Sequence, residues 1–247
     1  MKNKLFKSAI LFMVFSLFFI SCEEEIDPLQ KAQLKFKEST YISYDTNAYY
    51  PMVNNKGIRK VTTSTELLYD STDPVGYKYA WKSKELDKVY RGGELKFVSH
   101  KLDSIRVMQP SHFGGDSIRF IAAIKSNFPR RKRTPIGLIE NDWKYVRDSV
   151  FDNVHLTNYY REAETRENNG VQIVIEHHIF IDDEGHITRF ERKTLNDYKV
   201  TQVVVFAFSN YTMSTSIDKM EYQLPNYPVA YGRPKRINSS RKQIRTQ

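Results

Sequence analysis

Cysteine is almost absent from this sequence, and Cys22 is the only one among 247 residues. A single cysteine excludes an intramolecular disulfide, a Cys-x-x-Cys redox pair and a zinc site built from several thiolates. The phosphate-binding Gly-x-x-x-x-Gly-Lys loop and the Gly-x-Ser-x-Gly and His-Glu-x-x-His motifs are missing from the sequence as well. We therefore expect a protein that is not an enzyme and that holds no cofactor and no metal ion. One enzymatic alternative stays open, a pair of catalytic carboxylates far apart in sequence.

The segment before Cys22 has the pattern of an export signal. Lys2, Lys4 and Lys7 precede an apolar run over residues 9–20 that only Ser16 interrupts. The run is too short, and flanked by the wrong residues, for a stable membrane span. We predict that residues 1–21 are a signal peptide.

Residues 17–22, which read LFFISC, resemble the lipobox of bacterial lipoproteins, although Phe19 stands where that family usually has leucine. The resemblance implies that cleavage leaves Cys22 as the first residue and that fatty acids such as palmitate are attached to it. Each buried methylene of such a chain contributes about 0.8 kcal/mol to membrane binding. We therefore expect a lipid-anchored protein of the cell envelope, held in the outer membrane on its periplasmic face or at the cell surface.

Three glutamates follow the cysteine, and they have two interpretations. Residues 23–25 either form a solvated acidic tether or resemble the surface-export signals of Bacteroidota lipoproteins.

The net charge of +9 is concentrated at the two ends of the chain. Three positive charges belong to the signal peptide, and six belong to residues 225–247, which contain no acidic residue. The remaining body is nearly neutral, so we expect no nucleic-acid partner. The basic tail is expected either to be disordered or to contact acidic head groups, polysaccharide or peptidoglycan.

The first half of the chain has the composition of short β-strands. Aromatic and β-branched residues favour strands, and residues 58–69 alternate so that Val61, Thr63, Thr65 and Leu67 share one face. Residues 73–76, which read DPVG, predict a turn. Strands are expected at residues 40–44, 58–69, 77–81, 88–90, 94–98 and 104–108.

Two short helices are predicted to interrupt the sheet. Helical spacing with Asp116 as N-cap predicts a helix over residues 116–127, and Thr134 followed by proline predicts the start of a second helix through Ile139. The loop between them is strongly basic. It could bind a phosphate head group or could simply be solvated, and it contains Arg130, Arg131, Lys132 and Arg133.

Residues 154–208 are predicted to form a four-stranded antiparallel meander. Asn169-Gly170 is a strong signal for a hairpin turn, and residues 182–185 and 196–197 provide two further turns. The register that these turns imply gathers apolar side chains on one inward face. The predicted inward residues include Tyr160, Ile175, Ile179, Ile181, Phe190, Val203 and Val205. His177 and His178 are neighbours on a strand and point to opposite faces, so they do not form a metal site.

Successive strands, two short helices and a final meander resemble the unclosed β-barrel of the LolA and LolB lipoprotein-carrier families, and also the region before the thioredoxin domain in some Bacteroidota lipoproteins. The resemblance spans residues 34–224 and implies a mainly β (α+β) fold with a curved antiparallel sheet and two or three short helices. It also implies an apolar cavity for an acyl chain, lipid or lipoprotein. The residues implied to line it are Ile175, Ile179, Ile181, Phe190, Val203 and Val205.

The predicted organisation is therefore a signal peptide (1–21), an acidic tether (22–33), the β domain (34–224) and a basic tail (225–247). An apolar inner face is also what any sheet needs to form a core, and only unfilled volume makes it a binding site. The alternative function is that of a scaffold lipoprotein, which assembles with other envelope proteins and binds no small molecule.

Overall fold

The computed structural model describes residues 26–52, 57–128, 133–151 and 153–232. The predicted signal peptide, Cys22, the loop residues Arg130, Arg131 and Lys132, and the tail from residue 233 onward lie outside the described residues.

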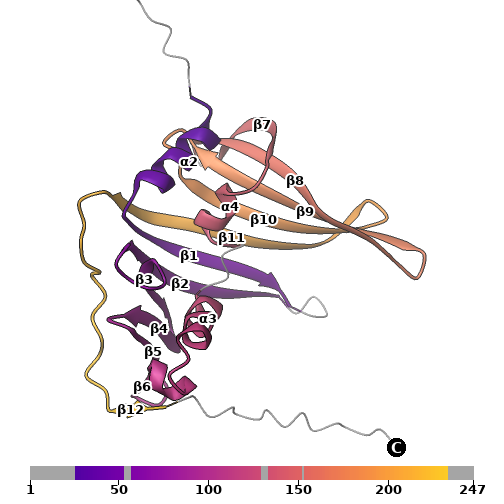
Figure 1. Ribbon diagram of the computed structural model, residues 1–247. Helices are drawn as coiled ribbons and strands as arrows, with labels where there is room; N and C mark the ends of the chain where they lie inside the picture. The colour runs from indigo at the N-terminus through magenta and orange to yellow at the C-terminus, as the bar shows by residue number, and fades with distance from the viewer. Residues whose placement is uncertain (1–25, 53–56, 129–132, 152, 233–247) are drawn as a thin grey trace, which may run out of the picture.

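One twelve-stranded sheet forms the frame of the molecule (Figure 1). Its strand order is β12-β6-β5-β4-β3-β2-β1-β11-β10-β9-β8-β7, and all pairings are antiparallel except that of β12 with β6. Strands β12 and β7 end the order and do not pair with each other, so the curved sheet is not closed. The bounds are β1 (Tyr41–Pro51), β2 (Ile58–Tyr69), β3 (Tyr77–Ser83), β4 (Leu86–Arg91), β5 (Glu94–Ser99), β6 (Ser104–Met108), β7 (Lys144–Phe151), β8 (Val154–Asn168), β9 (Val171–Asp182), β10 (Ile187–Asn196), β11 (Lys199–Ser214) and β12 (Val229–Tyr231).

Three α-helices in the described part of the chain pack on the concave face of the sheet (Figure 1). They are α2 (Pro28–Glu38), α3 (Ser117–Asn127) and α4 (Pro135–Ile139), and a 3₁₀ helix, η2 (Pro110–Phe113), precedes α3. The main core joins them to the strands through side chains such as Phe36, Ile124 and Leu138. The predicted fold class, a mainly β protein with an unclosed curved antiparallel sheet and short helices, is confirmed.

The convex face of β1 to β6 is covered by the coil between β11 and β12 (Figure 1). Met220 and Tyr222 of this coil pack against Leu68 and Val89 of the sheet. Apolar burial therefore stabilises the sheet from both sides.

The predicted turn at Asn169-Gly170 and the two predicted helix N-caps are confirmed. Asn169 and Gly170 have φ of 52° and 77°, the left-handed conformation that the β8–β9 turn requires. The Asp116 carboxylate accepts a hydrogen bond from the Arg119 amide at 3.0 Å and caps α3. Thr134 caps α4 in the same way, with proline at the first helical position.

The predicted register of the meander departs from the structure in each of its hairpins, and most in the last one. The β10–β11 turn lies at Asp197 and Tyr198, and a β-bulge then leaves Thr201 unpaired between the pairs Leu195–Val200 and Thr194–Gln202. One extra residue moves every following side chain to the other face.

The prediction that Val203 and Val205 point inward is therefore wrong. Phe190 lies opposite Phe206 on the concave face, whereas Val203 and Val205 lie opposite Lys193 and Glu191 on the convex face. A second bulge, in β8 between Glu162 and Glu164, likewise exchanges the faces on which the preceding side chains of that strand lie. It places Tyr159 on the concave face, and the predicted Tyr160 on the convex face.

Two segments expected outside the β domain contribute to it. Helix α2 begins at Pro28, within the predicted tether, and buries Ala32 completely. Strand β12 lies in the predicted basic tail and pairs with β6. The sequence also gave no sign of β7, the edge strand beside β8.

Candidate functional site: a hollow on the concave face

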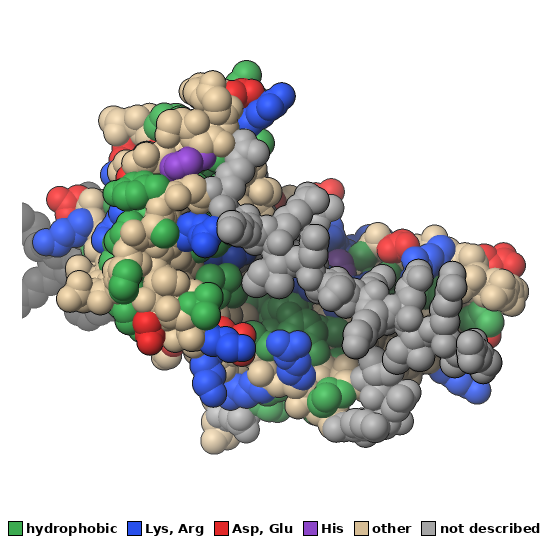
Figure 2. Space-filling model, turned by 90° about the horizontal axis from the view of Figure 1, so that it is seen from below, with side chains coloured by type: hydrophobic (Ala, Val, Ile, Leu, Met, Phe, Trp, Pro, Cys, Tyr) green, Lys and Arg blue, Asp and Glu red, His purple; other side chains and the backbone are tan. Residues whose placement is uncertain are grey.

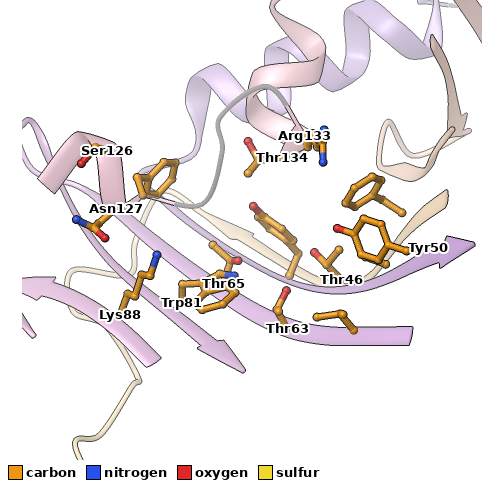
Figure 3. A pocket seen from close by; sticks show the side chains of 15 residues that line it. Thr46, Tyr50, Thr63, Thr65, Trp81, Lys88, Ser126, Asn127, Arg133 and Thr134 are labelled. Carbon is orange, nitrogen blue, oxygen red and sulfur yellow. The ribbon is translucent and has the colours of Figure 1, made fainter. Parts of the chain in front are cut away.

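A hollow of about 530 Å³ lies between the concave face of the sheet and the described residues at the end of α3 and directly before α4. Figure 3 shows its side chains: Thr46, Thr63 and Thr65 rise from the sheet, Ser126 and Asn127 come from the end of α3, and Arg133 and Thr134 precede α4. In the view from below, hydrophobic side chains form the floor of a hollow with Lys and Arg side chains beside it (Figure 2). The hollow is thus set into the face that the helices otherwise cover.

Strands β1 and β2 build the floor by strict alternation. Every second residue of β1 points inward, and the pairs Thr46–Thr63 and Ala48–Val61 set matching side chains next to each other. The other sheet residues of the floor and its walls are Tyr44, Tyr50, Thr65, Trp81, Lys88 and Phe206.

Phe128 closes the hollow on the helix side. Its ring centroid lies 5.3 Å from that of Tyr77 and 5.1 Å from that of Tyr79, and its amide donates to the Ile124 carbonyl at the end of α3. These aromatic contacts fix the end of α3 above the sheet.

The lining is apolar and aromatic, with hydroxyl groups and two cations. Burial raises the pKa of the Tyr44 phenol well above its ordinary value, so this group is neutral. Burial also lowers the pKa of Lys88, whose Nζ lies 5.5 Å from the Trp81 ring centroid. The Arg133 guanidinium lies 5.8 Å from the centroid of Phe206 at another part of the wall. A lining of this kind suits an apolar molecule that carries a few polar groups.

The sequence-predicted ligand residues do not line this hollow. Ile179, Ile181 and Phe190 lie on the concave face, but they are almost fully buried in the packed core. Ile175 shares that face and is 4% exposed, and Val203 and Val205 lie on the other face. Of the predicted basic loop, Arg133 is described, and it lines the hollow.

The lining residues that the sequence prediction missed come mainly from β1 and β2. The alternation over residues 58–69 had grouped Val61, Thr63 and Thr65 on one face, which is the signal that could have found them. A stripe of threonines on an inward face fills a core less well than isoleucine or leucine, and it marks the place where the floor is not packed against a helix.

A second, larger hollow of about 920 Å³ lies between the start of α2 and the β7–β8 edge. Its lining carries more ionisable side chains, among them Asp27, Asp148 and Asp183. Several are partnered: His155 Nδ1 lies 2.7 Å from Asp183 Oδ1, and Tyr159 donates a hydrogen bond to Asp27. It therefore suits an apolar ligand less well than the first hollow.

In the described residues, no cluster of three or more His, Cys, Asp or Glu side chains has an arrangement that could hold a metal ion. Within the same ranges, no helix combines the length and the apolar character needed to cross a membrane.

Fold and site together define a protein with an open, helix-covered β-sheet and a partly apolar hollow on its concave face. No protein-family model matches the sequence, and no curated protein is detectably similar to it.

Solved structures with a similar course of the chain do exist. Lipoprotein LppX of Mycobacterium tuberculosis is 8% identical, and the match covers 77% of this chain and 96% of LppX with a TM-score of 0.38. A putative outer membrane lipoprotein-sorting protein domain of Vibrio parahaemolyticus is 10% identical over 77% and 94% of the two chains, with a TM-score of 0.31. A LolA superfamily protein of Nitrosomonas europaea is 8% identical over 78% and 94%, with a TM-score of 0.21. At these identities and TM-scores, the similarity assigns no ligand and no activity to this chain.

Proposed function

We propose that this protein is a non-catalytic binding protein that holds a hydrophobic ligand, an acyl chain or lipid, alone or as part of a lipoprotein, in the concave hollow. The observation that carries the proposal is unfilled volume on a face that is otherwise packed. Protein cores leave few voids larger than a water molecule, and a hollow of about 530 Å³ is far larger than that. Ligand pockets commonly measure about 300–1,000 Å³ and have apolar walls with a few placed polar groups.

We further propose that the protein works at the surface of a membrane in the cell envelope, the outer membrane in a Bacteroidota-type cell. The support comes from the N-terminal sequence, in which an export signal ends at Cys22 in a lipobox-like stretch. A lipid anchor on Cys22 would hold the hollow close to the bilayer, where acyl chains are available.

The test is native mass spectrometry with lipid extraction. The mature chain carrying Cys22→Ala would be purified without detergent from an export-competent host. We expect the folded protein to carry an acyl ligand. Thr63→Trp, on the floor of the hollow, should exclude that ligand because an indole fills much of the space.

Thr62→Trp is the matched control. Thr62 is the neighbouring residue of β2, and its side chain is exposed on the convex face. This variant should retain the ligand. A ligand-free mass from well-folded protein with the natural Thr63 would overturn the proposal, and the role of a scaffold within an envelope complex would then be favoured.

A further inference from the structure

Basic side chains form a row on the concave face, at the Phe206 end of the hollow. Arg161 of β8 lies opposite His177 of β9, and His177 lies opposite Arg192 of β10. Opposite residues of neighbouring strands point to the same face. Arg133, which precedes α4, adds its charge to the same place, and we call these four residues the basic row.

The basic row is continuous with the hollow. The His177 ring centroid lies 5.1 Å from that of Phe190, and the Phe190 ring lies 5.7 Å from that of Phe206. Phe206 and Arg133 both line the hollow, so a ligand in it would have its end beside the row.

The guanidinium groups of the row are not neutralised. Within the described ranges, no carboxylate lies in ion-pair distance of Arg133, Arg161 or Arg192. The convex face of the same strand differs, because there Arg189 and Lys193 both pair with Glu191, at 2.5 and 3.3 Å. Among the described residues, the guanidinium groups of the basic row therefore lack the carboxylate partners that the convex face of this strand provides.

Arg161 is fixed in place by neutral partners. Its Nη1 donates to Asn141 Oδ1 at 2.5 Å, its guanidinium lies 5.3 Å from the Trp143 ring centroid, and its Nε is buried with no hydrogen-bond partner. A cation held partly out of water without a counter-ion is costly, and an anion from outside would relieve that cost.

The pKa of His177 is lowered by burial and by the same positive charges. Burial, the largest cause, and the positive charges of Arg161, Arg192 and Arg133 together lower the pKa of its imidazole to about 4. His177 is therefore neutral near pH 7 and can donate or accept a hydrogen bond there.

We propose that the basic row binds the anionic head group of the ligand, so that this protein takes an amphiphile with one acyl region and a carboxylate or phosphate. The inference rests on the proposed function and specifies its ligand. Guanidinium groups match carboxylate and phosphate oxygens in a bidentate geometry, and such charge-assisted hydrogen bonds are about twice as strong as neutral ones.

The test compares ligands that share a chain and differ in charge. One pair is palmitate and palmityl alcohol, and the other is palmitoyl lysophosphatidic acid and monopalmitoylglycerol. Binding would be measured by calorimetry on the mature chain with Cys22→Ala. The two pairs distinguish a carboxylate from a phosphate head group.

Arg192→Gln is the informative variant, since no hydrogen bond or ion pair holds Arg192 in the described residues. Lys193→Gln is the control, because it removes the same charge from the next residue, on the convex face. We expect Arg192→Gln to weaken the anionic member of at least one pair roughly tenfold. Lys193→Gln should leave the affinity for both members unchanged.

Equal affinity for charged and neutral ligands, together with an unchanged affinity in Arg192→Gln, would overturn this inference and leave the proposed function intact. Binding of none of the four amphiphiles by folded protein would overturn the proposed function and this inference with it. An equal loss in both arginine and lysine variants would also overturn the inference, because it would reflect net charge alone.

Discussion

The backbone amide of Tyr222 donates a hydrogen bond of 3.0 Å to Glu66 Oε2, although 156 residues separate the two in sequence. The same oxygen accepts a second hydrogen bond, from the Glu221 amide at 3.0 Å. The Tyr222 hydroxyl donates to Asp87 Oδ2 at 2.8 Å. Two nearly buried carboxylates of the convex face thus fix the C-terminal coil against the sheet.

Glu66→Gln should loosen this coil. An amide oxygen accepts hydrogen bonds more weakly than a carboxylate, so we expect a loss of about 1–3 kcal/mol in the free energy of unfolding. Hydrogen exchange of the coil over residues 217–224 should accelerate. Glu221→Gln, an exposed change in the coil itself, is the control and should leave exchange unchanged. Unaltered exchange in Glu66→Gln would show that apolar packing alone holds the coil.

Ile179→Asp and Val203→Asp test the corrected register, because both residues were expected to face inward. Ile179 is fully buried between Tyr159 and Phe190, whereas Val203 lies on the convex face opposite Lys193. Ile179→Asp should cost at least about 4 kcal/mol in urea unfolding, and Val203→Asp less than about 1 kcal/mol. Similar losses in the two variants would contradict the bulge at Thr201.

Gly185→Ala should be the more damaging of two glycine substitutions at left-handed positions. A Cβ on Gly185 would lie 2.9 Å from the backbone nitrogen of Ala32, so helix α2 would have to move. Gly170 has a similar φ of 77°, and a Cβ there would meet nothing within 4 Å. Thermal unfolding should show a loss of about 1 kcal/mol for Gly170→Ala and about 3 kcal/mol for Gly185→Ala. Equal losses would mean that α2 does not rest on this turn.

His177 should make the protein less stable in acid. Its pKa is lowered from 6.5 to about 4, so between these values the unfolded chain binds a proton that the folded protein does not. The contribution of His177 to the free energy of unfolding should therefore fall as the pH drops through this window, and it should level off below about pH 4. The groups that oppose its protonation are Arg161, Arg192, Arg133 and His178.

The measurement is urea unfolding of the natural protein and of His177→Gln across this pH window. The variant should lose less stability on acidification than the natural protein. If the free energy of unfolding changed with pH equally in the two proteins, His177 would have an ordinary pKa, and neither burial nor the charges of the basic row would lower it.

Cys22→Ala should release the protein from membranes, because it removes the residue that the proposed anchor modifies. Cell fractionation would check this, with Ser16→Ala in the signal peptide as a control that should stay membrane-bound. If Cys22→Ala still pelleted with the envelope fraction, the lipid-anchor proposal would lose its main support.

Features set by a few neighbouring residues could be predicted from the sequence. The caps at Asp116 and Thr134 and the turn at Asn169-Gly170 each depend on residues within one turn of chain. Helix α2 was missed because its sequence is rich in Lys and Gln, and only Ala32 and Phe36 are buried. Strand β7 was missed because most of its side chains are exposed, so no alternation marks it.

The two bulges could not be predicted, and they decide which residues lie on the concave face. A bulge leaves no clear mark in composition, yet Thr201 alone reverses the faces of Val203 and Val205. The hollow was beyond prediction for another reason. Its walls come from β1, β2, β3, β4, β11 and the described residues that follow α3 and precede α4. Its volume depends on how all of these elements pack together.

The pairing of β1 with β11 has a consequence for when this protein can fold. Tyr41 lies opposite Ser214 in the middle of the sheet, so the central pairing cannot form until most of the chain has been synthesised. Contacts between such distant residues make folding slow, because a long loop must close first. For a chain that must cross a membrane before it folds, as we propose, this delay would leave time for translocation in an extended form.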